Sequence, residues 1–425
     1  MTDPLVLFRA IHIAATVLAS GTVAFAVFVA EPAARTAGAV SIDSLRGQLN
    51  VTVWCALAVG AIAEAAWLIW LSADIYGAPV IAVCLHGGVW TVFTDTRFGL
   101  VSAIRLGLAA VLAVLILWPA ARLLQFVAAA GLIGLLAFVG HAGATPGMAG
   151  TIHLASDMVH LLAAGGWLGG LPALALVFAH TRRADNSGSR QFAIGVTRRF
   201  SRLGAICVGA LLISGIVNSC NLLNGPRDLV ATDYGRLIFM KIGLFIAMLG
   251  IAATNRFHFT PQLPSARALY ALQRNSLAET GLGLVVLLFV GALGTLSPSG
   301  HAHSINADVP PDAVFVHIHT ADAMAEVAVS AGRIGEANAH IRILRDDFSE
   351  YPTSSVELTL EPPGAGRKIA RAAARLPDGT WEVNGLELPQ AGVWTVRLII
   401  ANGDGRPLVL DAPIVIESGQ TAPHS

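Results

Sequence analysis

Residues 153–170 hold the side chains of this sequence that are best suited to bind a metal ion. His153, Asp157 and His160 are spaced so that, on a helix, all three lie on one stripe. They open an apolar run that continues to about Phe178 and is long enough to cross a bilayer. Imidazoles and a carboxylate are costly beside lipid, so we expect them to face protein, a cavity or a ligand. Imidazole binds copper, zinc, iron and nickel, so the spacing alone does not select the metal. The alternative to a metal site is a hydrogen-bonded polar seam between helices.

The composition is that of a membrane protein. Of the 425 residues, 55% are hydrophobic and only 13% are charged, whereas a soluble domain has about 25% charged residues. The formal net charge is zero, which gives no support to nucleic-acid binding. Charged residues are much denser after residue 300, where the long apolar runs end. This change indicates a second, water-exposed domain.

Eight apolar segments are long enough to span a membrane as helices. They are residues 5–30, 51–73, 101–118, 122–140, 153–178, 201–220, 236–255 and 277–296. The first contains a stretch like a signal peptide, but its leading residues are not basic, so we expect residues 1–26 to be retained. Residues 75–98 are apolar but interrupted by glycine and proline. We expect them to lie at the surface or re-enter the membrane rather than to form a ninth span.

The arginines predict how the spans are oriented. Several of them follow the fifth and the seventh segments, and the loop 141–152 contains no lysine or arginine. Basic loops stay on the cytoplasmic side. We therefore expect a multi-pass protein of the bacterial inner membrane, whose N-terminus and C-terminal region after residue 297 are periplasmic.

From about residue 308 the pattern changes to short alternating strands separated by turns. Seven or so strands, punctuated by Pro-Asp-Gly and similar turns, predict a small β-sandwich over residues 313–418. The predicted fold is thus an all-α polytopic membrane bundle of about eight helices followed by a small all-β sandwich domain. We place the transmembrane helical domain at residues 1–296 and a linker at residues 297–312.

The predicted topology gathers candidate metal ligands in the outer half of the membrane. His12 lies about two turns into the first span, and His141 ends the fourth span. Met148 lies in the loop that leads to the stripe of His153, Asp157 and His160. Imidazole and thioether ligands together favour copper over magnesium or calcium.

The predicted β-sandwich domain adds a second candidate site. His317 and His319 would project from the same face of a strand, with Met324 close behind them in the sequence. Such a pair could bind a metal ion, and the alternative is a solvated surface.

Other buried polar residues could form a transport path or have a structural role. Glu64 and Glu279 are intramembrane acids, which mark functional sites or form ion pairs, here with Lys241 or Arg105. The complete set comprises Glu64, Asn218, Tyr234, Lys241, Asn255 and Glu279.

Several motifs resemble the CopD family of copper-resistance membrane proteins. One is Arg-Phe-Ser-Arg at 199–202, followed by a span that ends in Ser-Gly-Ile-Val-Asn. Another is Thr-Asp-Tyr-Gly-Arg-Leu at 232–237, which leads to Lys241 and then to Asn-Arg at the end of that span. The resemblance covers about residues 196–296. Upstream, His160 followed by Trp-Leu-Gly-Gly is similar to another helix of the family.

This resemblance implies an inner-membrane protein that handles copper and is usually described as moving it into the cytoplasm. The tail, with its His-Ile-His element and Met324, resembles the small β-domain that follows the CopD region in some relatives. Other relatives carry a CopC-like copper-binding domain. A separate periplasmic CopC-like protein, or the C-terminal domain itself, is therefore expected to deliver the metal.

Three functions stay open. The leading hypothesis is a copper import or copper-resistance permease, not an enzyme, that passes Cu(I) or Cu(II) inward from histidine ligands. The second is a membrane electron-transfer protein or metalloreductase, because histidines on adjacent helices also hold haem b. The third is a periplasm-facing copper receptor that does not transport.

Overall fold

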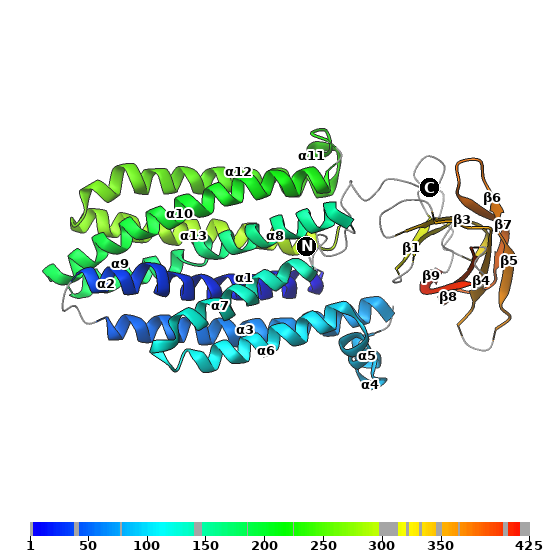
Figure 1. Cartoon of the computed structure of the whole chain (residues 1–425), viewed down its shortest axis with the longest axis horizontal. Helices are drawn as coiled ribbons and strands as arrows, with labels where there is room; N and C mark the ends of the chain where they lie inside the picture. The colour runs from blue at the N-terminus through cyan, green and yellow to red at the C-terminus, as the bar shows by residue number, and fades with distance from the viewer. Residues whose placement is uncertain are drawn as a thin grey trace, which may run out of the picture. The chain divides into compact units, whose positions relative to one another are not determined.

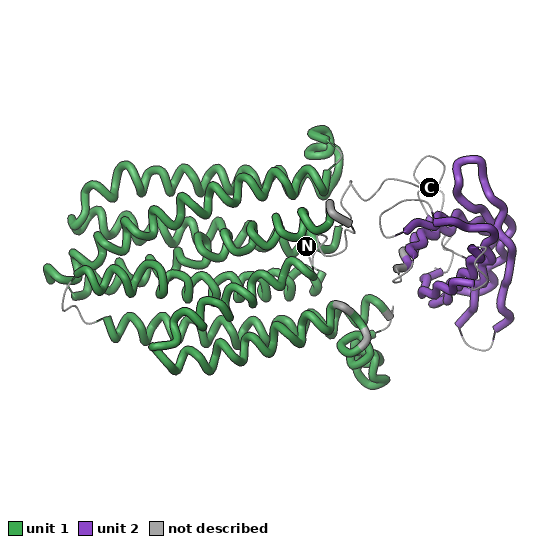
Figure 2. Tube along the Cα trace, in the orientation of Figure 1, with its two compact units in different colours: residues 1–145, 149–301 green, residues 146–148, 302–425 purple. Residues whose placement is uncertain are grey.

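The protein is described from a computed structural model. The structure describes residues 3–37, 42–76, 79–139, 147–184, 186–223, 225–296, 313–319, 323–330, 334–345, 351–363, 366–402 and 407–416. Four candidate ligands are affected. His141 lies outside these residues, and the side chain of Met148 is not described. The side chains of His317 and His319 are likewise outside the description. The chain divides into two compact units, residues 1–145 with 149–301 and residues 146–148 with 302–425 (Figure 2).

The first unit is a bundle of long helices. Its α-helices are α1 (Pro4–Phe25), α2 (Glu31–Thr36), α3 (Asp43–Tyr76), α4 (Val80–Leu85), α5 (Gly88–Asp95), α6 (Arg97–Leu115), α7 (Arg122–Gly134), α8 (Gly147–Leu168), α9 (Leu171–Ala184), α10 (Ser187–Leu222), α11 (Asp228–Ala231), α12 (Asp233–Thr254) and α13 (Ala266–Leu293). Short π- and 3₁₀-helical segments join them: η1 (Ala26–Ala30), η2 (Pro119–Ala121), η3 (Leu135–Val139), η5 (Asn255–Phe259) and η6 (Thr260–Gln262). The bundle has two ends (Figure 1). The Pro4 end is where α1 begins and α13 finishes, and the Ala184 end is where α9 finishes and α10 begins.

The eight predicted spans are confirmed. Eight helices or continuous helical stretches in the described residues are long and apolar enough to cross a membrane, and each overlaps one predicted segment. The apolar stretch 75–98 forms the two short helices α4 and α5 and is not among the spans. These short helices lie at the Pro4 end of the bundle (Figure 1).

Side-chain caps define where the long helices begin. Asp3 accepts a hydrogen bond from the amide of Leu5 at the start of α1, where Pro4 is the first helical residue. Thr232 caps α12, and Ser265 caps α13, in the same way. The polar residues that precede these helices thus accept hydrogen bonds from the first backbone amides of the helices.

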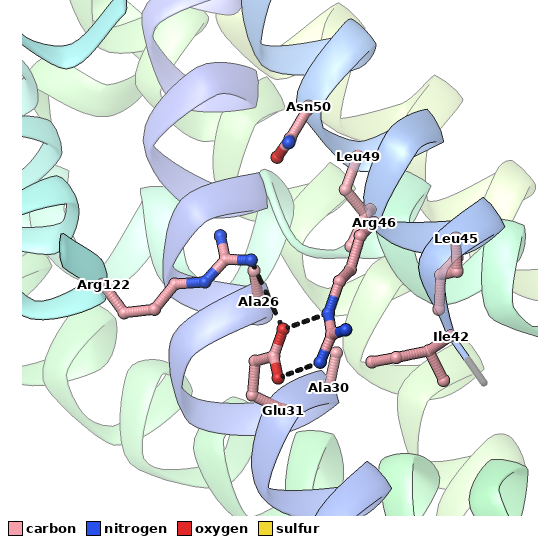
Figure 3. Close-up of a pocket in the computed structure, with 9 residues that line it drawn as sticks. All are labelled: Ala26, Ala30, Glu31, Ile42, Leu45, Arg46, Leu49, Asn50 and Arg122. Carbon is pink, nitrogen blue, oxygen red and sulfur yellow. Dashed lines mark hydrogen bonds and ion pairs between the residues drawn. The ribbon is translucent and has the colours of Figure 1, made fainter. Parts of the chain in front are cut away.

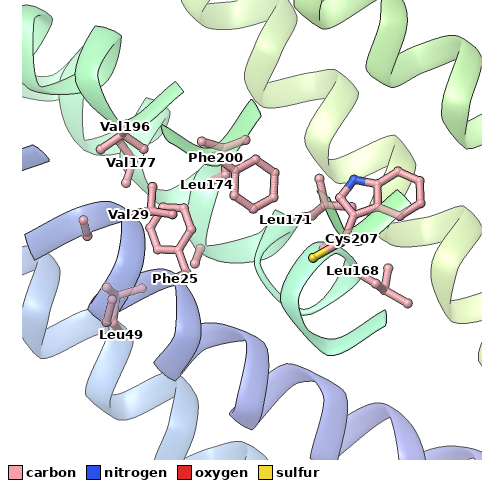
Figure 4. Packing of buried hydrophobic residues seen from close by; sticks show 14 of the residues in the cluster. Phe25, Val29, Leu49, Leu168, Leu171, Leu174, Val177, Val196, Phe200 and Cys207 are labelled. Atoms are coloured by element: carbon pink, nitrogen blue, oxygen red, sulfur yellow. The ribbon is translucent and has the colours of Figure 1, made fainter. Parts of the chain in front are cut away.

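The stretches α1–α2 and α8–α9 form the centre of the bundle. The apolar windows of these two spans are 78% and 67% buried, against 11% for the span that contains α12. Gly21 of α1 lies against the backbone of α8, because a Cβ at Gly21 would overlap the carbonyl oxygen of Gly165. The Gly-Gly-Trp-Leu-Gly-Gly sequence therefore permits close helix packing through small residues. Towards the Ala184 end, the rings of Phe25 and Phe200 pack 5.8 Å apart in the same core (Figure 4).

Near the Ala184 end an ion-pair cluster joins three helices. Glu31 of α2 accepts two hydrogen bonds of 2.8 Å from the guanidinium of Arg46 on α3. Arg122 of α7 donates to the same carboxylate at 3.3 Å (Figure 3). The bidentate geometry fixes α2 against α3 at the point where the chain turns back.

The second unit is a β-sandwich, which confirms the predicted fold class. Its described strands are β1 (Val314–His319), β2 (Met324–Val329), β3 (Gly335–Leu344), β4 (Ser355–Glu361), β5 (Ile369–Ala372), β6 (Ala374–Arg375), β7 (Trp381–Leu388), β8 (Gly392–Ala401) and β9 (Leu408–Ile416). They form one sheet in the order β1-β2-β3-β7-β6 and another in the order β5-β4-β8-β9. All strand pairs are antiparallel. Inward-facing residues of both sheets make one core, in which Trp394 is fully buried and its Nε1 donates to the carbonyl of Gln390.

Candidate metal site

His12 lies in a polar network within the membrane. Its ring is 3% exposed. The carbonyl oxygen of Gly60 lies 2.9 Å from Nδ1 and can only accept, so Nδ1 carries the proton. Nε2 then accepts a hydrogen bond from the guanidinium of Arg105. Because both ring nitrogens are engaged, His12 can bind a metal ion only after Arg105 has moved away.

The same network neutralises Glu64, one of the intramembrane acids. Arg105 of α6 pairs with Glu64 of α3 at 3.3 Å, and both side chains are almost wholly buried. Arg105 also donates to the hydroxyl of Thr16 at 3.4 Å. Of the alternatives considered for Glu64, the structure therefore shows the ion pair with Arg105.

A second network connects the α8 stripe with α10. Asn218 donates to Oδ1 of Asp157 at 3.2 Å, and Nδ1 of His160 lies 3.0 Å from the hydroxyl of Ser214. Asp157 and His160 are three residues apart, whereas Ser214 and Asn218 are four residues apart. The two pairs meet because α8 and α10 run in opposite directions (Figure 1).

The hydroxyl of Ser214 fixes the tautomer of His160. Ser214 Oγ donates its proton to the carbonyl of Ala210 at 2.6 Å, so it accepts from Nδ1 of His160. Nε2 of His160 consequently has a free lone pair, and among the described residues it has no hydrogen-bond partner. A histidine whose other nitrogen is held in this way is arranged as metal-ligating histidines usually are.

Charged groups from two other helices surround this network. Lys241 of α12 acts electrostatically on both Asp157 and His160. Arg9 of α1 also acts on Asp157, and its guanidinium lies 5.3 Å from the centre of the Trp67 ring. Asp157 is thus an acid within electrostatic reach of basic side chains from α1 and α12.

Towards the Ala184 end, a third polar group joins α13 to the end of α12. Asn255 donates to Oε1 of Glu279 at 2.9 Å, and Asn275 donates to Oδ1 of Asn255 at 2.7 Å. This group lies at the other end of α12 from Tyr234, which is buried at the Pro4 end. Asn255 and Glu279 therefore form a group separate from Tyr234.

In the β-sandwich, strand pairing brings the predicted ligands together. Met324 of β2 lies directly opposite His319 of β1 in the antiparallel register, and Glu326 lies opposite His317. The alternate residues Val316 and Ile318 enter the core. Positions 317, 319 and 324 are thus neighbours in the strand register, and the side chain of Met324 is buried.

The described residues do not include a complete metal site. Within them, no three His, Cys, Asp or Glu side chains lie close enough together to hold one metal ion. His153 is 2% exposed and precedes Asp157 on the same helix. His141 and the side chain of Met148 lie outside the described residues. The copper site therefore stays a prediction.

Several contributors to these networks were not among the predicted site residues, and Ser214 and Arg9 are two of them. Ser214 belongs to the Ser-Gly-Ile-Val-Asn motif, and its spacing from Asn218 matches the spacing of Asp157 and His160 on an antiparallel neighbour. This match of spacings could have predicted the contact between α8 and α10. Arg9 and its electrostatic effect on Asp157 had no comparable signal, because helix adjacency decides it.

Comparison with known proteins supports a copper-related role. The family model described as copper resistance protein D matches residues 194–293, and the model of the copper resistance protein D-like N-terminal domain matches residues 1–151. Copper resistance protein D of Pseudomonas syringae pv. tomato is 32% identical over 223 residues, which make up 49% of this chain and 71% of that protein. The chain belongs to the CopD family. The family likeness expected from residues 196–296 is therefore confirmed, and it extends to the first half of the bundle.

Two other relatives of this CopD-family chain carry different names. The copper transport protein CutJ of Bacillus subtilis (strain 168) is 25% identical over 285 residues, covering 64% of this chain and 48% of that protein. The inner membrane protein YebZ of Escherichia coli (strain K12) is 32% identical over 215 residues, covering 49% of this chain and 72% of that protein. These names describe copper resistance, copper transport or membrane location, and they give no support to the haem hypothesis.

Proposed function

We propose that this CopD-family protein binds copper near the Pro4 end of its bundle and carries it across the bacterial inner membrane. Import and copper resistance are both compatible with such a permease, and we assign it no catalysed reaction. The observation that carries the proposal is the geometry of His160, whose Nδ1 is held by Ser214 while Nε2 keeps its lone pair. Copper of either oxidation state accepts imidazole nitrogen.

The remaining ligands would come from the groups around His160. His141 and Met148 flank the start of α8 in the sequence, and His153, two turns before His160 on α8, would mark a separate position for copper. His12 would join them only if Arg105 released its Nε2. Asp157 would contribute negative charge against Lys241 and Arg9.

The β-sandwich would collect copper before it enters the bundle. The register that places His319 opposite Met324, with His317 two positions away, supports a small nitrogen and sulfur site there. With the Pro4 end facing the periplasm, as the arginine-rich loops at the other end favour, this domain would also be periplasmic. A CopC-like periplasmic protein would then be the natural donor of copper.

The test is the copper content and optical spectrum of the purified full chain, compared with the His153→Ala, His160→Ala and double variants. We expect bound copper in the wild type, its loss in His160→Ala, and copper flux into proteoliposomes. The control is His258→Ala, an exposed histidine at the Ala184 end, which should retain copper.

Each of the other possible results would assign a different role to the protein. A Soret band that disappears with His160 would overturn the proposal in favour of a haem protein. Bound copper without flux would replace the permease with a receptor. If neither copper nor haem is bound, the polar stripe only joins helices.

A further inference from the structure

A cavity that is partly open to its surroundings lies between helices of the bundle near the Ala184 end, away from the proposed copper ligands. Its volume is about 220 Å³, and residues of α8, α9, α10, α12 and α13 line it. Aromatic rings of Trp167, Phe178 and Phe200 form much of its apolar wall. Asn255 and Glu279 contribute polar groups to the same wall. The cavity is therefore large enough to admit several water molecules beside a carboxyl group.

Within the part of the chain that the structure describes, Glu279 has one hydrogen-bond donor and no neighbouring cation that pairs with it. Its side chain is 1% exposed, and Asn255 donates to it at 2.9 Å. Asn275 donates in turn to Oδ1 of Asn255, which fixes the amide so that its NH₂ group points to the carboxyl. Among the described residues, no Lys, Arg or His forms an ion pair with Glu279.

The one basic side chain in the described lining forms its hydrogen bond with a group other than Glu279. Arg256 lines the cavity, but its Nη1 donates to the carbonyl of Ser201 on α10 at 3.3 Å. The residues that α8 and α9 contribute, among them Trp167 and Phe178, carry no titratable group, and α10 supplies only hydroxyls and apolar side chains. Glu279 is therefore the ionisable acid of this cavity.

Comparison with Glu64 shows that the carboxyl group of Glu279 needs a neutralising partner. Glu64 is equally buried, but Arg105 neutralises it at 3.3 Å. An ionised carboxylate without such a partner is very unfavourable in a low-dielectric environment, so a proton or a bound cation must neutralise Glu279. The lining contains no His, Cys or Met, and copper prefers those ligands. A proton is the ligand that fits.

The backbone at Asn255 supports a functional role for the cavity. Here α12 passes into the π-helical segment η5, and Thr260 donates to the carbonyl of Asn255 at 2.7 Å. Such π-helical turns are rare and occur often at functional sites. This one lies where the amide that contacts Glu279 is attached.

We propose that Glu279 is a reversible proton-binding site that couples copper movement to protons. A hydronium ion in the cavity gives its proton to the carboxylate and leaves water, and the reverse step returns the proton to water. No electron transfer and no further reactant are involved. The coupling rests on the proposed copper transport, whereas proton binding by Glu279 does not.

The first test is infrared spectroscopy of the full chain as pH is changed. We expect a carbonyl band of a buried, protonated carboxyl group that changes with pH and is absent in Glu279→Gln. Gln keeps the oxygen that accepts from Asn255, so the fold should survive. The double variant Glu64→Leu/Arg105→Met is the control, because it removes an equally buried acid together with its cation, and it should keep the band. If Glu279→Gln does not fold, Asn255→Ala should shift the band by removing its hydrogen-bond donor.

The second test is copper flux into proteoliposomes at a series of pH values. Wild type should change by up to about tenfold per pH unit over part of the range, and Glu279→Gln by less than about twofold. Glu357→Gln, an exposed change in β4, should behave as wild type. A band that persists in Glu279→Gln, no such band in wild type, or an unchanged flux profile in Glu279→Gln would overturn the proposal. Absent flux in wild type would refute copper transport and with it the coupling, and the infrared result would still decide proton binding.

Discussion

Replacing Arg105 by Met should destabilise the bundle strongly. Arg105 is fully buried and is the cation that neutralises Glu64 at 3.3 Å. Removing one partner of a buried ion pair costs about 3–5 kcal/mol, because the other charge stays buried without compensation. Loss of the hydrogen bond to Nε2 of His12 adds about 1–3 kcal/mol, since that acceptor has no other described partner.

The double variant separates the two contributions. With Glu64→Leu added to Arg105→Met, no charge stays unpaired, so only the about 1–3 kcal/mol from His12 should remain. The assay is reversible unfolding in mixed detergents, followed by circular dichroism. Arg198→Met is the matched control, since Arg198 is exposed on α10, and it should change the free energy of unfolding by less than about 0.5 kcal/mol. A loss below about 1 kcal/mol in Arg105→Met, or additive effects in the double variant, would refute the reasoning.

Three further predictions concern positioning and packing. Ser214→Ala should weaken copper binding about 10–100-fold in a chelator competition, because it removes the group that orients His160; unchanged affinity would exclude that role. Gly21→Leu should cost at least about 1–3 kcal/mol in detergent unfolding, because its side chain would overlap the backbone at Gly165; a stable variant would contradict so close a crossing. Trp394→Ala should cost the β-sandwich about 3–5 kcal/mol, since Trp394 is fully buried between the sheets. Calorimetry of the full chain would show this as a lower transition temperature of that unit alone, and an unchanged transition would contradict it.

The membrane spans could be predicted because their length and apolar composition are local properties. The short strands β5 and β6 escaped prediction, since they are mostly exposed and show no alternation. It was harder to predict which polar residues pair with one another. The pairing of Glu64 with Arg105 could be named as an alternative because both charges are costly in lipid. The bond from His12 to the carbonyl of Gly60 could not, because a backbone acceptor gives no sequence signal.

The stripe of His153, Asp157 and His160 on α8 is better described as two candidate positions for copper than as one site. His153 and His160 are seven residues apart on a continuous helix, which separates them by about 10.5 Å along its axis. A metal ion binds imidazole nitrogen at about 2 Å, so one shared ion would require both side chains to lean towards Asp157. The ring of His160 is held by Ser214 on α10. A copper ion on His160 must therefore take its next ligand from a residue outside this stripe. The single variants then distinguish the positions: His160→Ala should remove that copper, whereas His153→Ala should leave it bound.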